Sequence, residues 1–418
     1  MAKSYVRNCM LYLGIKYNIT KDILKEYLEK PLFEYIKKHR HILTDEGYAE
    51  LNKCINTLFV EQNISGELDI EKMKSYALEK TDNDAYQAME GMIHNFCSLA
   101  SRAGSQVPFS SINYGTDTTE EGRMVIKNVL LATKAGLGNG ETAIFPISVF
   151  RMRKGITDKG SPNYDLFKLS CEVSSVRLYP NHLNTSSSFN DPYVKEGDPR
   201  TLVATMGCRT RVLGNVHDPN NEISYGRGNL FMVTLNLPYY ALEAVEYCKE
   251  HPDTDKIIKF YEIFDERIQD AFGQLDERFE IVAKRKAKNY PFLMGQHVYL
   301  GSEKLHPDDE IREVLKQGTL TIGFIGLAET LVALVGKHHG ESKTAWELGY
   351  QIISHLNDAC KAKSDETKMN YSCMGTPAEG CCGRLLKSVR KRFGTLKGIS
   401  DHEYLSNSHH RLECGIAA

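Results

Sequence analysis

Residues 226–238 read GRGNLFMVTLNLP and contain the passage from strand to helix on which the fold depends. The glycines at 226 and 228 suit a tight turn, and the apolar run Met232–Leu237 suits a strand. Pro238 has the backbone angle of a first helical turn, so a helix should follow it. Asn229 enters the strand, where its amide can orient a substrate hydroxyl, although such a residue more often closes a turn.

The same alternation of strand and helix extends in both directions from this stretch. Thr319–Ile325 and Asn370–Met374 are further strand candidates that each lead into a helix, and Ile144–Phe150 is an earlier one. A long charged helix is expected from about 254 to 288. Thr118 to Glu121 provide N-cap and first-turn acidic signals for a helix that should stop at Gly136. Strands that alternate with helices predict an α/β layer architecture.

The first hundred residues predict helices near 20–40, 44–63 and 70–100, where apolar residues recur at three- and four-residue spacing. We expect these apolar faces to pack inside their own domain, with packing against a partner protomer as the alternative. From Ser105 the chain becomes rich in Gly, Pro, Asn and Thr. Three regions are therefore expected: a helical segment 1–100, an α/β region 101–408 and a tail 409–418.

Composition narrows the range of partners. Apolar residues at 41% and charged residues at 25% are typical of a globular protein. A net charge of -2 provides no field for attracting nucleic acid or an anionic membrane, so neither is an expected direct partner. No apolar run reaches the roughly 18 residues that suggest a spanning helix, and the N-terminus lacks a signal-peptide pattern. The eleven scattered cysteines show no CxxC spacing, so we expect a reducing cytoplasm and no metal site.

The segment Met206–Arg211, MGCRTR, is the first that can carry chemistry. Gly207 allows a tight loop in which the thiol of Cys208 approaches a ligand closely. Arg209 and Arg211 supply cationic groups that favour thiolate and anion binding. The ordinary alternative is that Cys208 only fills space, because free cysteine is among the most buried residue types.

The segment Thr376–Gly380, TPAEG, lies between a predicted strand and a predicted helix. Thr376 can be the N-cap, Pro377 suits the first helical position and Glu379 completes a capping box. A helix N-terminus behind a strand is also a natural seat for phosphate, because its free N–H groups and positive dipole end attract anions. The two interpretations are compatible, and both stay open.

Three other features have simpler interpretations. Gly136–Gly140 is followed by no Lys–Ser/Thr pair, so a helix-ending turn is favoured over a P-loop. Cys381–Cys382 lie inside an expected amphipathic helix, where ordinary packing is favoured. Lys337–His339 are interpreted as a helix terminus, because neighbouring histidines point in different directions.

Taken in order, these segments resemble the anaerobic (class III, glycyl-radical) ribonucleoside-triphosphate reductases, with coverage from roughly residue 70 to 408. The segments that carry the resemblance are 101–113 (SRAGSQVPFSSIN), 136–140 with Phe145–Pro146, 162–165 (PNYD), 206–209 (MGCR), 226–230 (GRGNL), 318–329, 336–341 and 376–380. The resemblance implies a ten-stranded α/β barrel, incomplete here, with a finger loop through its centre.

The resemblance also implies a chemistry: removal of the ribose 2′-hydroxyl of ribonucleoside triphosphates. A partner radical-SAM activase with an iron–sulfur cluster generates a glycyl radical in the family, and a finger-loop cysteine matched by Cys208 becomes the thiyl radical. Asn229 matches the asparagine of members that use formate as reductant. The residues that match the substrate-binding segments are Gln106, Ser110, Ser111, Arg209, Thr376, Pro377, Ala378, Glu379 and Gly380. ATP and dNTP effectors and a homodimer are further implications.

The sequence also departs from the family pattern. It contains no Arg–Val–x–Gly–Tyr radical segment, no preceding CxxC pairs, no ATP-binding cone and no early strand with the second active-site cysteine. Ala100 stands where a histidine is usual, and His409–His410 replace Phe–His. We therefore expect a chain truncated at both ends that binds no cofactor and is inactive alone. A non-catalytic remnant that binds nucleotide or dimerises is the alternative, whereas the MGCR loop disfavours a glycyl-radical lyase.

Overall fold

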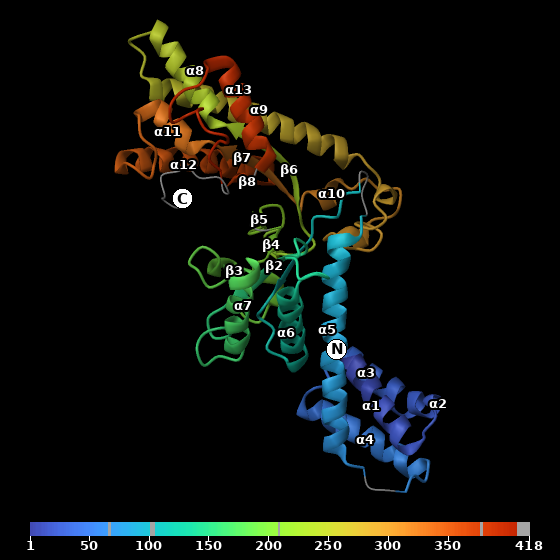
Figure 1. Ribbon diagram of the computed structural model, residues 1–418. Coiled ribbons are helices and arrows are strands. Elements are labelled where there is room, and N and C mark those ends of the chain that lie inside the picture. The colour runs from blue at the N-terminus through green and yellow to red at the C-terminus, as the bar shows by residue number, and fades with distance from the viewer. Residues whose placement is uncertain (66–67, 101–104, 208–209, 377–378, 408–418) are drawn as a thin grey trace. The chain divides into compact units, whose positions relative to one another are not determined.

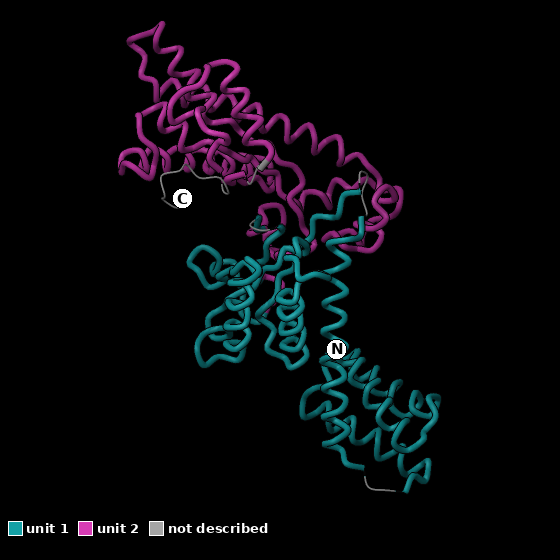
Figure 2. The backbone as a smooth tube through the Cα atoms, in the orientation of Figure 1, with its two compact units in different colours: residues 1–197, 202–211 teal, residues 198–201, 212–418 magenta. Residues whose placement is uncertain are grey.

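The computed structural model describes residues 1–65, 68–100, 105–207, 210–376 and 379–407. The chain forms two compact units (Figure 2). Unit 1 contains residues 1–197 and 202–211, and unit 2 contains residues 198–201 and 212–418. Each unit has its own helices and its own parallel sheet.

Unit 1 begins with a helical region in which apolar faces pack on one another. Its helices are α1 (Ala2–Tyr17), α2 (Lys21–Leu24), the π-helical turn η1 (Lys25–Glu29), α3 (Lys30–His39), α4 (Asp45–Glu61) and α5 (Ile70–Ser98). The side chains of Thr44 and Asp69 cap α4 and α5 by accepting a backbone N–H in the first turn. Tyr5, Leu28 and Met73 are among the fully buried residues of this core. The helices predicted near 20–40, 44–63 and 70–100 are confirmed.

A three-stranded parallel sheet follows in unit 1, in the order β1 (Ser111–Tyr114), β2 (Ile147–Met152) and β3 (Asn181–Asn184). Helices α6 (Glu120–Ala135) and α7 (Tyr164–Arg177) connect these strands and bury Leu130 and Val173 against Phe150 of β2. The predicted cap at Thr119 and the stop at Gly136 are confirmed. The strand expected from Ile144 begins at Ile147, because Pro146 has no N–H to donate to a ladder.

Short elements complete unit 1 and begin unit 2. The turn η2 (Asp191–Tyr193) precedes a small antiparallel ladder of β4 (Thr205–Met206) and β5 (Thr210–Arg211). Unit 2 begins with η3 (Pro199–Thr201), and η4 (Ala287–Asn289), η5 (Ser302–Lys304) and α10 (Arg312–Leu315) lie between its longer elements.

Unit 2 is built on a second parallel sheet, in the order β6 (Asn229–Asn236), β7 (Thr319–Ile325) and β8 (Asn370–Gly375). Its main helices, labelled in Figure 1, are α8 (Leu237–Glu250), α9 (Lys256–Ala283), α11 (Leu327–Val335), α12 (Lys343–Thr367) and α13 (Glu379–Phe393). The three strands predicted here and the helix through Pro238 are confirmed. The long charged helix is confirmed as α9.

The two faces of the second sheet differ because side chains alternate along each strand. Leu320 and Ile322 point to the face that packs with α9 and α12, in a core that also contains Phe264 and Leu356. Thr321, one residue on from Leu320, points to the other face. The apolar face therefore stabilises unit 2, and the other face carries polar side chains such as the buried Thr321.

The predicted fold class, α/β with N-terminal helices, is confirmed. Within the described ranges, no helix is both long and apolar enough to cross a membrane.

Candidate functional site

The residues that the sequence singled out are divided between the two units. Gln106, Ser110 and Ser111 belong to unit 1, and Asn229, Thr376 and Gly380 belong to unit 2. Four candidates lie outside the described residues: Cys208, Arg209, Pro377 and Ala378. Glu379 begins α13.

In unit 1, β1 holds the strand that leads to Cys208. Ser111 accepts a hydrogen bond at Oγ from the backbone N–H of Gly207, at 3.1 Å. Asn113, two residues along the same face, donates its Nδ2 to the carbonyl of Thr205 at 2.8 Å and accepts the Thr205 N–H at 3.0 Å. One amide thus satisfies both backbone groups of Thr205. The residue that immediately precedes Cys208 is therefore fixed to the first strand of the sheet.

Beyond the loop, the return strand is held by Arg211. Its Nη1 donates to Asn190 Oδ1 at 2.8 Å, and its guanidinium lies 4.3 Å from the ring centroid of Phe189. Burial lowers the pKa of Arg211. Arg211, which the sequence predicts as a cation that favours anion binding, makes these two contacts with the segment before the loop.

The other candidates of unit 1 have fewer contacts. Ser110 accepts the Ile147 N–H at its carbonyl, whereas its buried Oγ has no partner among the described residues. Gln106 is exposed. Ser110 thus places a buried hydroxyl without a partner among the described residues one position before Ser111, which anchors the loop.

In unit 2, Asn229 belongs to a row of polar side chains that crosses the sheet. Thr321 of β7 donates its hydroxyl to Asn229 Oδ1 at 2.9 Å, and its Oγ1 lies 3.1 Å from Ser372 Oγ of β8. The bond to Thr321 occupies Oδ1 of Asn229 and so restrains its amide group, whose Nδ2 can act as a donor.

A second polar pair lies nearer the carboxyl ends of the strands. Thr234 Oγ1 and Thr376 Oγ1 are 3.2 Å apart, and Gly323 of β7 lies between them. A Cβ on Gly323 would come within 1.9 Å of Thr376 Oγ1, so only glycine fits. Thr376 also extends the ladder by donating its N–H to the carbonyl of Phe324 at 3.0 Å.

From Thr376 the chain continues to α13, which begins at Glu379 with Gly380 exposed. The first turn of a 15-residue helix thus stands at the carboxyl end of a parallel strand. In open α/β sheets this edge is where ligands bind, and the N–H groups of a helix N-terminus favour anions there. Basic residues occupy the last turn, as the helix dipole favours.

Four of the described cysteines, Cys9, Cys54, Cys360 and Cys382, are buried, whereas Cys171 is exposed. Burial raises the pKa of Cys9 to about 12 and also raises the pKa of Cys54, Cys360 and Cys373. Protonated buried thiols are poor nucleophiles and poor ligands. Cys382 is likewise buried, in a cluster with Leu386, which confirms the packing interpretation. His338 and His339 follow the end of α11 at Gly336, as predicted.

Sequence reasoning missed Asn113, Thr321, Ser372 and Gly323. A signal was present for three of them, because Thr321 and Gly323 alternate with Leu320, Ile322 and Phe324, and Ser372 falls at the matching position of the next strand. Asn113 gave no such signal, since its partner Thr205 is 92 residues away.

The chain is thus an α/β protein that fixes the base of the Cys208 loop on one parallel sheet and carries a row of polar side chains on another. More particularly, this chain belongs to the anaerobic ribonucleoside-triphosphate reductase family, whose family model matches residues 23–413. The anaerobic ribonucleoside-triphosphate reductase of Haemophilus influenzae is 33% identical over 347 residues, which are 82% of this chain and 46% of that protein. That of Enterobacteria phage T4 is 33% identical over 340 residues, covering 80% and 52%.

The fold resembles solved structures of the same group. The anaerobic ribonucleotide reductase of Thermotoga maritima, with citrate in its active site, matches with a TM-score of 0.56 at 13% identity, covering 85% of this chain and 59% of that chain. A second anaerobic ribonucleotide reductase also gives 0.56, at 14% identity, covering 84% and 51%. The chain spans about half the length of the curated relatives it matches.

Proposed function

We propose that this chain carries a central part of the catalytic machinery for the anaerobic reduction of ribonucleoside triphosphates to 2′-deoxyribonucleoside triphosphates, which are DNA precursors. Family membership supports the reaction class. The observation that carries the proposal is the fixed base of the cysteine loop, where Ser111 and Asn113 hold Gly207 and Thr205. A side chain that abstracts hydrogen must be held within contact of the reacting carbon, and a rigid loop base supplies that orientation.

In the proposed mechanism Cys208 is the thiyl radical that takes the 3′-hydrogen of the ribose. The S–H bond forms as the C3′–H bond breaks, and the 2′-hydroxyl takes up one proton and leaves as water. After the reduction at C2′, the Cys208 thiol returns hydrogen to C3′, which restores the thiyl radical. Asn229, oriented by Thr321, hydrogen-bonds the substrate or formate, which supplies two electrons and becomes carbon dioxide. The first turn of α13, with Thr376 and Gly380, binds phosphate together with Pro377, Ala378, Glu379 and Arg209. Gln106, Ser110 and Ser111 line the substrate side of unit 1.

The proposal extends to partners. A radical-SAM activase with an iron–sulfur cluster generates the glycyl radical, and ATP and dNTP act as effectors. A Thermotoga maritima relative, similar at a TM-score of 0.51, has been solved in complex with dATP and CTP. We propose a homodimer in the cytoplasm, with the helices of residues 1–100 on the dimer and effector side, 101–408 as the reductase core and 409–418 as a tail outside it.

The test is strictly anaerobic reduction of CTP by the full chain with activase, formate and ATP, with and without a radical-glycine segment from a relative added in trans. Deoxynucleotide formed only with that segment supports a split reductase. No product in either case with CTP binding retained favours the alternative, a non-catalytic nucleotide-binding or dimerising remnant. Omitting formate from the productive reaction tests the reductant by itself.

A further inference from the structure

Glu329 is a buried carboxylate that the proposed chemistry does not use. It lies in the first turn of the nine-residue helix α11 and is 0% exposed. Its neighbours on the helix, Ala328 and Leu331, are buried apolar residues. Removing a carboxylate from water is costly unless hydrogen bonds replace the lost hydration. The partners of Glu329 therefore indicate why a charge is present in an apolar helix.

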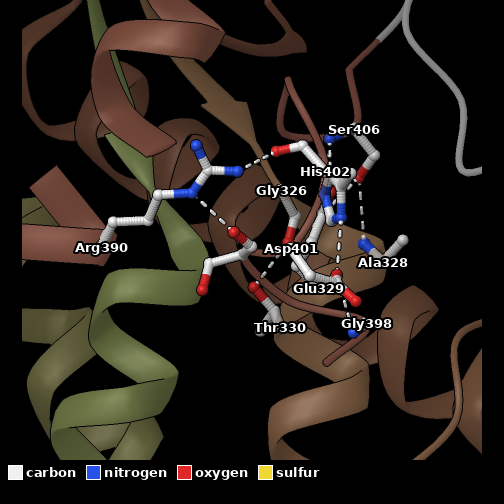
Figure 3. A network of polar contacts seen from close by, with 10 residues as sticks. Gly326, Ala328, Glu329, Thr330, Arg390, Gly398, Asp401, His402 and Ser406 are labelled. Atoms are coloured by element: carbon white, nitrogen blue, oxygen red, sulfur yellow. Dashed lines mark hydrogen bonds and ion pairs between the residues drawn. The ribbon is translucent and has the colours of Figure 1, made fainter. Parts of the chain in front are cut away.

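Those partners belong to one segment near the end of the described chain, as Figure 3 shows. Glu329 Oε1 accepts the backbone N–H of Ser406 at 2.7 Å and Nε2–H of His402 at 3.0 Å. Glu329 Oε2 accepts the hydroxyl of Ser406 at 2.5 Å. Both carboxylate oxygens are thus bound to residues 73 and 77 positions away in the sequence.

The same segment, residues 400–406, is also bonded to the end of β7. The N–H of Gly326, the residue after the strand, donates to the carbonyl of Ser406 at 2.7 Å. The N–H of Ala328 donates to Ser406 Oγ at 3.3 Å. Ser406 is consequently fixed at the carboxyl edge of the sheet, beside the strand that pairs with β8.

On its other side the segment 400–406 holds α13. Leu405 is fully buried and clusters with Ile325 of β7 and with Cys382 and Leu386 of α13. Arg390 of α13 donates Nε to the carbonyl of Ser400 at 2.6 Å and Nη2 to that of His402 at 2.5 Å. Cys382 is three residues from Glu379, where α13 begins, so the packing of Leu405 reaches the first turn of that helix.

We propose that Glu329 is a positioning residue: through residues 400–406 it fixes the direction of the first turn of α13 and so the geometry of the phosphate seat. The route runs from the carboxylate to Ser406 and His402, from these to Leu405, and from Leu405 to Cys382. The link to phosphate rests on the proposed function, whereas the link to α13 rests on these contacts alone. Several N–H groups at a helix N-terminus bind one anion together, so a small shift of that terminus lowers the affinity for the anion.

The test compares the full chain with Glu329→Gln, which keeps the shape but removes the charge and one acceptor. Hydrogen–deuterium exchange in residues 379–386 and 400–406 should become about tenfold faster, while exchange in α5 and β6 stays unchanged. Binding of CTP should weaken by about tenfold. Glu347→Gln, an exposed glutamate of α12 in the same unit, is the matched control and should alter neither measurement.

Ser406→Ala provides a milder second variant in case Glu329→Gln fails to fold, since it deletes one hydroxyl and leaves the backbone bonds in place. Hydrogen exchange in residues 379–386 and 400–406 should again become faster, but by a smaller factor. Uniformly faster exchange across unit 2, or unchanged exchange in residues 379–386, would overturn the inference and leave Glu329 with a general stabilising role. If the unaltered chain binds no CTP, the proposed phosphate seat fails, yet the exchange comparison still decides whether Glu329 positions α13.

Discussion

The two parallel sheets use their polar side chains in different ways. In unit 1 the strand β1 directs Ser111 and Asn113 at the backbone of another segment, the base of the cysteine loop. In unit 2 the strands direct Asn229, Thr321 and Ser372 at one another, so that a row of side chains becomes a single oriented surface. One sheet fixes where a loop begins, and the other fixes which way functional groups point.

Because of this difference, we expect substitutions in the two sheets to impair different properties of the protein. Damage to the unit 1 anchor should impair the radical step and spare nucleotide binding, because the loop carries the reactive thiol. Damage to the polar face of unit 2 should affect folding and ligand binding together, because its groups satisfy one another and leave little room.

The largest effect is expected from Cys208→Ala in a complete, activated enzyme. Turnover should fall to background, because no other side chain of the loop can exchange a hydrogen atom with a ribose carbon. CTP binding should change by less than about twofold, since the anchor and the polar face remain. Deoxynucleotide formation and CTP affinity, measured on the same preparation, check the loss of turnover and the retained binding. Retained turnover would remove Cys208 from the mechanism.

The second effect is on the polar face of unit 2. Gly323→Ala should destabilise unit 2 by at least about 1–3 kcal/mol, because the new methyl group would overlap Thr376 Oγ1. The midpoint of thermal unfolding and the affinity for CTP should both fall. Gly273→Ala in helix α9, where a Cβ meets nothing within 4 Å, is the matched control and should be neutral or slightly stabilising.

A double variant sharpens this second prediction. Gly323→Ala with Thr376→Ala should recover part of the lost stability, because the overlapping oxygen is gone and the remaining contacts are 3.1 Å to Thr234 Oγ1 and 3.2 Å to the Thr376 Cβ. A double-mutant cycle measures this coupling directly. Additive losses would mean that the face tolerates crowding and is not the close-packed surface described here.

The third effect is on the unit 1 anchor. Asn113→Ala removes the two hydrogen bonds to the Thr205 backbone and the one from its hydroxyl, and should cost about 1–3 kcal/mol in stability, because the buried backbone groups lose their partner. Turnover in a complete enzyme should fall by about tenfold or more, with CTP affinity nearly unchanged. Asn139→Ala, at the exposed Gly136–Gly140 turn, is the control. Equal losses of turnover and affinity would contradict the division between the sheets.

The same contrast explains what the sequence could predict. Thr319–Ile325 was predicted at its observed bounds, because TLTIGFI is β-rich, alternates and is enclosed by glycines. The strands SINY and NHLN of unit 1 were not predicted, because they are four residues long and half polar. Their formation depends on partners such as Thr205, and the site contact between Ser111 and Gly207 spans 96 residues. Local pattern identifies elements, whereas such long-range hydrogen bonds become visible only in the folded chain.

Glu329 illustrates the same limit of local pattern. In the sequence GFIGLAETL it occupies an ordinary first-turn position, where an acidic residue suits the helix dipole. Its bonds to His402 and Ser406 depend on where the chain returns more than seventy residues later. The charge is explained by that return and not by the helix.

The smallest effect concerns pH. Hydrogen bonding to Glu329 is the leading cause that raises the pKa of His402 above its usual range, and Asp401 adds to it. Arg390 of α13 donates to the His402 carbonyl, and His339 near Glu329 has a pKa lowered by burial. Because the folded state holds the proton of His402 more tightly, its contribution is fully present below about pH 6.5 and is lost as pH rises through the raised pKa.

His402→Gln keeps a donor towards Glu329 but cannot carry the charge. It should therefore lower the unfolding midpoint most at about pH 6, by a few degrees at most, with the difference from the unaltered chain shrinking towards pH 9. Midpoints measured at four or five pH values on both proteins check the sign. A difference that is constant with pH would show that His402 acts only as a neutral donor. The attachment of residues 400–406 to α11 would then depend on Ser406 and the Glu329 carboxylate without a contribution from a charged histidine.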